Sequence, residues 1–161
     1  MDLLSREILK DVYLGEVNPK AAAPKNPVDH WSPAILLERA AYLRKLAKHG
    51  DGSASETLKE YPQHCAMLSF RSRDGEVELH ERFADLFCVL AGKATLITGG
   101  VVNGARTVAL GETRGVSIEG GVKQTLRAGD VAHVPAGTPH QMLVKPEDTI
   151  TCLVMKVQEV V

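Results

Sequence analysis

From Gln63 onward the sequence is a series of short apolar runs separated by turn residues. Val, Ile, Thr and Leu dominate runs of about five to eight residues, and Gly, Asp and Asn stand between them. This pattern is typical of an all-β sandwich or barrel. Strands are predicted over residues 65–69, 76–80, 86–90, 94–98, 107–110, 122–126, 131–134, 141–144 and 149–157.

Turn residues separate these predicted strands. Asn103-Gly104 is the sharpest hairpin signal, because both residues tolerate the positive φ angles of a tight hairpin turn. The Gly-rich, polar segment 111–121 is expected to be a loop. Further turns are expected at residues 73–75, 91–93, 128–130 and 145–148.

The segment before the apolar runs contains a well-marked helix. Ser32 offers a hydroxyl for the N-cap, and Pro33 suits the first helical position. The helix is predicted over residues 33–48, with Gly50 as its stop. One face of this helix is expected to carry Leu36, Ala40, Leu43 and Ala47.

Weaker signals surround that helix. A short helix is predicted over residues 3–14, followed by a Pro- and Ala-rich arm at 18–27. Ser53-Ala-Ser-Glu56 has the pattern of a capping box and predicts a second short helix that ends near residues 61–62. The chain is therefore divided into an arm with helices, residues 1–60, and a β-barrel, residues 61–161.

Composition narrows the class of protein. A chain of 161 residues with 44% hydrophobic residues is long enough for one domain with its own core. Its net charge is -1 and it has no Lys/Arg block, which argues against nucleic acid or a membrane as partner. The N-terminus has no secretory pattern, and three free cysteines fit a reducing compartment, so a cytoplasmic location is expected: Cys65, Cys88 and Cys152.

Four side chains could converge on one site in a barrel. Glu78 and His80 are two residues apart on a predicted strand and therefore project from the same face. Asp85 follows a predicted turn, and His140 follows a rigid Pro- and Gly-containing turn. Imidazoles and carboxylates together suit a divalent first-row ion such as Mn, Fe, Ni or Zn. Such a site leaves coordination positions open for Lewis-acid or O₂ chemistry.

The stretch from Gly129 to His140 resembles a motif of the cupin superfamily. Gly129-x5-Pro135-x-Gly137-x2-His140 matches the second cupin motif at each position up to its histidine. Val144 stands where the family has a closing Asn.

The stretch from Glu78 to Gly92 resembles a degenerate form of the other cupin motif. His80-x4-Asp85-x6-Gly92 has the spacing of the first motif from its second histidine onward. Asp85 stands where the family usually has Glu, and Glu78 stands where it has its first histidine. The resemblance covers roughly residues 63–157.

The resemblance implies a double-stranded β-helix, or jelly-roll barrel, here with an N-terminal helical extension. It implies a homodimer, and metal ligands at the positions of Glu78, His80, Asp85 and His140. A metal-dependent enzyme acting on a small oxygenated organic molecule is the first hypothesis, with the reaction unassigned.

Three alternatives stay open. The cavity could belong to a non-catalytic small-molecule binding or sensing module, with or without metal. His80 and His140 could hydrogen-bond Glu78 and Asp85 in a metal-free polar pocket. The protein could also be a storage or structural cupin whose pocket has decayed.

Four further residues have weaker expectations. Glu81 is expected in solvent by strand alternation, with a ligand role as the alternative. His133 could face the cavity or sit in a core or interface. His64 is expected to be structural, and Trp31 to anchor the arm on the barrel, with a role as a substrate lid as the alternative.

Overall fold

The computed structural model describes residues 28–159 and divides the chain into two compact units, one ending at Trp31 and the other beginning at Ser32. The predicted helix at 3–14 and the arm at 18–27 lie outside the described residues. Because Trp31 belongs to the first unit, its anchoring role stays a prediction. In the described part of the chain, no helix has both the length and the apolar character that a membrane span requires.

The helix predicted from Ser32-Pro33 is confirmed as α2, Pro33–His49. The Ser32 hydroxyl accepts a hydrogen bond from the Ile35 N–H, and Gly50 forms the C-cap. The four buried residues of the helix are the predicted face: Leu36, Ala40, Leu43 and Ala47. This face packs against β1 and β2. The packing stabilises α2, because an isolated helix of this length would be marginal in water.

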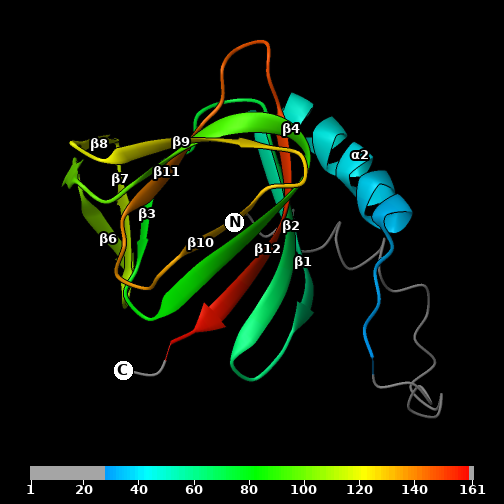
Figure 1. Cartoon of the computed structure of the whole chain (residues 1–161), viewed down its shortest axis with the longest axis horizontal. Coiled ribbons are helices and arrows are strands. Elements are labelled where there is room, and N and C mark those ends of the chain that lie inside the picture. The colour runs from blue at the N-terminus through cyan, green and yellow to red at the C-terminus, as the bar shows by residue number, and fades with distance from the viewer. Residues whose placement is uncertain (1–27, 160–161) are drawn as a thin grey trace. The chain divides into compact units, whose positions relative to one another are not determined.

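Antiparallel strands make up most of the described chain (Figure 1). The larger sheet has the order β1-β2-β12-β4-β11-β3-β7-β6, with β9 and β10 also pairing with β4, while β5 and β8 pair separately. The strands are β1 Ser53–Glu60, β2 His64–Arg71, β3 Val77–His80, β4 Phe83–Thr98, β5 Val101–Asn103, β6 Arg106–Ala109, β7 Glu112–Gly115, β8 Ser117–Glu119, β9 Val122–Arg127, β10 Val131–Val134, β11 His140–Leu143 and β12 Ile150–Gln158. The sheet curls into the predicted jelly-roll barrel (Figure 1).

The second predicted helix is wrong, because its residues form β1. Ser53–Glu60 pairs antiparallel with β2, so long-range strand pairing overrides a local capping pattern. Glu56, the acid of that pattern, is 1% exposed and makes two hydrogen bonds to the Arg39 guanidinium of α2. The predicted division at residue 60 stays a prediction, although the sheet itself begins at Ser53.

The predicted turn at residues 91–93 is also wrong, because β4 continues through it for 16 residues. The N-terminal half of β4 pairs with β10 and β12, and its C-terminal end pairs with β9 and β11. Gly92 keeps a φ of 79° within this strand, close to an irregularity in the pairing with β12. One long strand therefore connects the strands β10 and β12 at one end with the strands β9 and β11 at the other.

The segment predicted as a loop, 111–121, contains β7 and β8. Asn103-Gly104 does turn the chain, but β5 pairs with β8 and β6 pairs with β7. The predicted tight hairpin is therefore wrong. Strands as short as these carry too little local signal to be recognised without their partners.

The interior of the barrel is apolar beyond the polar site described below. Its core gathers side chains from strands that are distant in sequence, including Leu96 of β4, Met142 of β11 and Val154 of β12. The remaining core residues are Val89, Ala94, Leu126, Val134, Val144, Ile150 and Cys152. Burial of these side chains stabilises the barrel, and strand pairing places β11, β3 and β7 side by side.

Candidate metal centre

Strand register brings the polar groups of the site together. Glu78 on β3 lies directly opposite His140 on β11 and opposite Arg114 on the other neighbour, β7. His80, two residues further along β3, lies opposite Glu112 of β7. Side chains on paired positions point to the same face, so these groups form a row across three strands.

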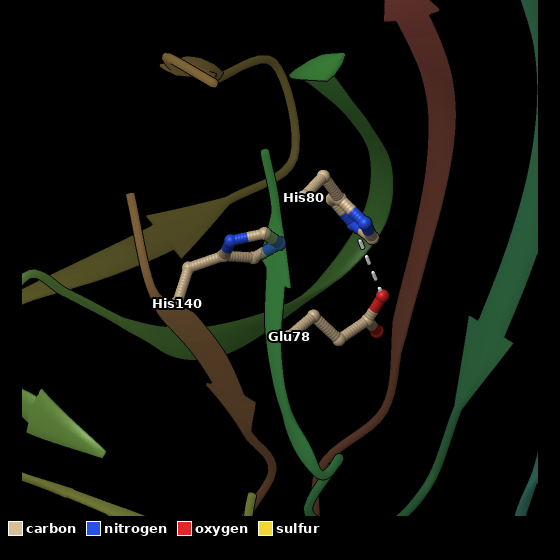
Figure 2. A group of neighbouring side chains, drawn as sticks. All are labelled: Glu78, His80 and His140. Atoms are coloured by element: carbon tan, nitrogen blue, oxygen red, sulfur yellow. Dashed lines mark ion pairs between the residues drawn. The ribbon is translucent and has the colours of Figure 1, made fainter. Parts of the chain in front are cut away.

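The side chains of Glu78, His80 and His140 converge inside the barrel (Figure 2). Each offers one ligand atom, and these atoms all lie within 4.8 Å of one another. Glu78 Oε2 is 3.4 Å from His80 Nε2, which confirms that the two side chains share a face. His80 is 3% exposed and His140 is 4% exposed, so bulk water does not screen them.

Each histidine is oriented by a hydrogen bond at its Nδ1 atom. His80 Nδ1 lies 2.6 Å from Glu112 Oε2, and His140 Nδ1 lies 3.1 Å from the Thr138 carbonyl oxygen. Both partners are acceptors, so Nδ1 carries the proton in each ring. In a neutral imidazole the Nε2 lone pair is then free to face the site.

The Nε2 atom of His140 is buried and has no hydrogen-bond partner among the described residues. Asp85 Oδ2 lies 3.3 Å away, which is an ion-pair distance only when this nitrogen carries a proton. A buried polar atom without a protein partner is costly and is most often explained by a water or an ion. The atom faces the other ligand candidates, which fits the role of a metal ligand.

Asp85 is brought to the site by β4 and is held there by a lysine. The carboxylate is 3% exposed and lies 3.3 Å from His80 Nε2. Lys156 of β12 lies directly opposite Asp85 in the strand register, and its Nζ donates to Oδ1 and Oδ2 at 2.8 and 3.0 Å. The same Nζ lies 2.8 Å from His80 Nε2, and the neutral imidazole protonated at Nδ1 accepts a hydrogen bond from it there.

The carboxylates give the site a strong preference for positive charge. Burial opposes the charged form of His80, but Asp85 and Glu78 outweigh it and raise the pKa of His80 to about 9. Burial likewise opposes ionisation of Glu78, yet the His80 contact and the charges of Arg114 and Lys156 lower its pKa to about 2. The pKa of Asp85 is also lowered, by its two histidine neighbours and Lys156 against the effect of burial.

Two arginines complete the surroundings of Glu78. Arg71 Nη2 lies 3.5 Å from Glu78 Oε1, and Arg114 Nη2 lies 3.7 Å from Glu78 Oε2. Arg114 also donates to Glu112 at 3.2 Å. These cations balance the carboxylates while leaving the histidine Nε2 atoms facing inward.

A cavity of about 580 Å³ opens beside the candidate ligands. Glu78, Asp85 and His140 lie in its wall together with Lys156. Its lining is mixed, with Arg71, Arg73 and Arg114, the hydroxyls of Ser53, Ser55 and Ser69, and the apolar groups Met67, Phe87 and Ile150. The cavity is large enough for a small organic molecule with polar substituents.

Three further residues with sequence-based expectations lie outside the cluster. Glu81 is exposed, as strand alternation predicted. His133 has a side chain 56% exposed, so it neither faces the cavity nor sits in the core of this chain. His64 stacks on Tyr61 with ring centroids 4.3 Å apart, consistent with a structural role.

Sequence reasoning missed Lys156, Glu112 and Arg114. A lysine inside the apolar run of β12 was the one available signal for Lys156, since a charge in such a run needs a partner. Glu112 and Arg114 lie in the segment expected to be a loop, where no face could be assigned. Their places follow only from the pairing of β3 with β7.

The donor set fits a divalent first-row ion. Two imidazole nitrogens and a carboxylate are ligands that such ions accept, and both histidines have the acceptor partners that orient metal-binding imidazoles. Glu78, His80 and His140 would hold the ion, with Asp85 adjacent and occupied by Lys156.

No protein-family model matches the sequence, and no curated protein is significantly similar to it. Solved structures do match the fold. Protein TT1209 from Thermus thermophilus superposes with a TM-score of 0.54 at 17% identity, covering 76% of this chain and 93% of that chain. A predicted oxalate decarboxylase from Thermotoga maritima gives 0.50 at 11% identity, with 66% and 81% covered. A cupin superfamily protein from Desulfitobacterium hafniense gives 0.47 at 16% identity, with 66% and 78% covered.

Proposed function

We propose that this chain, which has the cupin fold, binds a divalent first-row metal ion and uses it on a small oxygenated organic molecule in the adjacent cavity. The ligands in this proposal are Glu78, His80 and His140. The ion is Mn, Fe, Ni or Zn. The reaction class is left open, because one fold supports many reactions.

One observation carries the proposal: the buried Nε2 of His140, unpartnered within the described residues, faces the carboxylate of Glu78 and the imidazole of His80. A metal-free polar pocket would be expected to pair this atom, since an unsatisfied buried acceptor costs about 1–3 kcal/mol. An ion bound by all three side chains removes that cost.

The side chains around the bound ion would then have separate roles. The bound ion supplies Lewis acidity and open coordination positions. Arg71 and Arg114 line the cavity beside Glu78 and can hold the oxygens of a substrate. Asp85 is held ionised because its histidine neighbours and Lys156 lower its pKa, and its negative charge in the cavity wall favours a bound cation.

Elemental analysis of protein purified without chelator or nickel resin tests the proposal. The native protein is expected to retain close to one equivalent of metal. His140→Ala should lose it, whereas His133→Ala removes an exposed histidine and should retain it. Glu78→Gln and Glu81→Gln form the matching carboxylate pair, and loss is expected only for Glu78. Full metal retention by folded His140→Ala would reject the ligand assignment.

A second candidate is a binding or sensing module that works without metal. It is favoured by Lys156, whose ammonium group already satisfies His80 and Asp85. Native protein that neither contains metal nor takes it up, but still binds small organic molecules in the cavity, would support this candidate over the first. The homodimer and the cytoplasmic location stay predictions.

A further inference from the structure

We propose that Lys156 is a built-in cation that competes with the metal ion for the site, and that Asp85 serves as the counter-ion of this lysine instead of a fourth ligand. This inference rests on the proposed metal site, which it deepens by adding a regulating residue. The role of Lys156 does not follow from the cupin motif positions because Lys156 lies outside both motifs, and Asp85 stands at a motif position where the resemblance implies a ligand instead.

The position of Lys156 is fixed by the backbone. In the β12–β4 register Lys156 lies opposite Asp85, so the lysine reaches the site from a paired strand position and not from a loop. Its Nζ makes hydrogen bonds to both Asp85 oxygens at 2.8 and 3.0 Å. The preference of the site for positive charge is therefore met in part by the chain itself.

The same ammonium group occupies a proposed ligand atom. Lys156 Nζ lies 2.8 Å from His80 Nε2, and the other nitrogen of that ring is committed to Glu112 at 2.6 Å. A ring nitrogen can carry its own proton, accept a hydrogen bond or bind a metal ion, but only one of these at a time. Metal binding through His80 must therefore break the contact between Lys156 and His80.

Lys156 is able to leave His80 without unfolding the barrel. Its side chain is 24% exposed and lines the cavity, and a lysine has a flexible four-carbon stem. Asp85 can keep the ammonium group while His80 is released. Asp85 Oδ2 lies 3.3 Å from the Nε2 atoms of both His80 and His140, so the lysine held by Asp85 stays next to the proposed ligand atoms.

The test is the affinity of the metal-free protein for Zn²⁺ and Mn²⁺, measured by competition with a chromophoric chelator. Lys156→Met removes the charge and keeps the stem, and Lys156→Gln provides a second, polar variant. Lys93→Met is the matched control, since Lys93 also faces an aspartate but at the surface. Circular dichroism and thermal unfolding establish that each variant is folded.

We expect Lys156→Met and Lys156→Gln to bind metal about tenfold more tightly or better, since they remove a like charge and free a ligand atom. Lys93→Met should match the native protein. Equal or weaker binding by both folded Lys156 variants, with native protein still binding metal, overturns the inference and leaves the proposed metal site intact.

Two other outcomes separate the proposals. If the Lys156 variants bind metal and the native protein does not, competition by Lys156 is supported and the metal-dependent function of the native protein is rejected. If no form binds metal, both proposals fail.

Discussion

At the scale of single residues, the site is a balance between three carboxylates and the cations around them. Glu78, Asp85 and Glu112 each lie within 3.4 Å of a His80 nitrogen. The charged forms of Glu78 and Asp85 are favoured in the folded state, although burial alone would oppose them. The folded barrel is thus stabilised by ionised acids.

The stability of metal-free protein is therefore expected to fall in acid. The pKa of Glu78 is about 2 when folded and near 4.5 in its ordinary state, so the unfolded chain binds more protons between these values. This contribution is complete above about pH 4.5 and is lost as the pH falls toward 2. Urea unfolding in chelator at a series of pH values measures it.

The Glu78→Gln variant should show a shallower loss of stability with acid than Glu81→Gln, which changes an exposed carboxylate. Identical acid profiles for the two variants would show that Glu78 is not held ionised by its neighbours.

At the scale of elements, β4 decides how the two halves of the barrel join. The strand runs through Gly92, where φ is 79° and a Cβ atom would overlap the carbonyl oxygen of Thr149. This close approach explains physically why a glycine stands at the end of the first motif-like stretch. The turn residues predicted there lie instead within one continuous strand.

Gly92→Ala is expected to destabilise the protein by about 3 kcal/mol or more, because it adds a backbone clash to the strain of positive φ. Gly120→Ala is the matched control: its φ is 72°, and apart from the glycine and its two chain neighbours no atom of the described residues lies within 4 Å of the added carbon. It should cost only about 1–2 kcal/mol. Chemical denaturation of both variants measures the difference, and similar losses would show that the clash is relieved by small shifts.

At the scale of the whole molecule, the site exists only when distant segments are assembled. Glu78 and His80 come from β3, His140 from β11, and the Asp85–Lys156 pair from β4 and β12. The unfolded chain has no equivalent cluster. A bound metal should therefore stabilise the folded state by mass action.

We expect the midpoint of thermal unfolding of the native protein to rise with metal concentration. At a free metal concentration about 100 times the dissociation constant, the gain is about 2.7 kcal/mol, or roughly 5–10 °C for a domain of this size. Differential scanning calorimetry measures the shift. The His140→Ala variant should show none, and an equal shift in that variant would place the bound metal elsewhere.

The sequence by itself determined the all-β class, the helix at Pro33–His49 with its buried face, and the shared face of Glu78 and His80. These features follow from periodicity, capping residues and strand alternation, which act over a few neighbouring residues. The motif-like spacing also placed His140 at the right point of the chain.

Only the tertiary structure decided which strands pair. The residues with a capping pattern form β1 because they pair with β2. Part of the segment predicted as a loop forms β7, and its pairing with β3 brings Glu112 to His80 and Arg114 to Glu78. The pairing of β12 with β4 sets Lys156 opposite Asp85. Such contacts join residues tens of positions apart, and local preferences carry no information about register between distant strands.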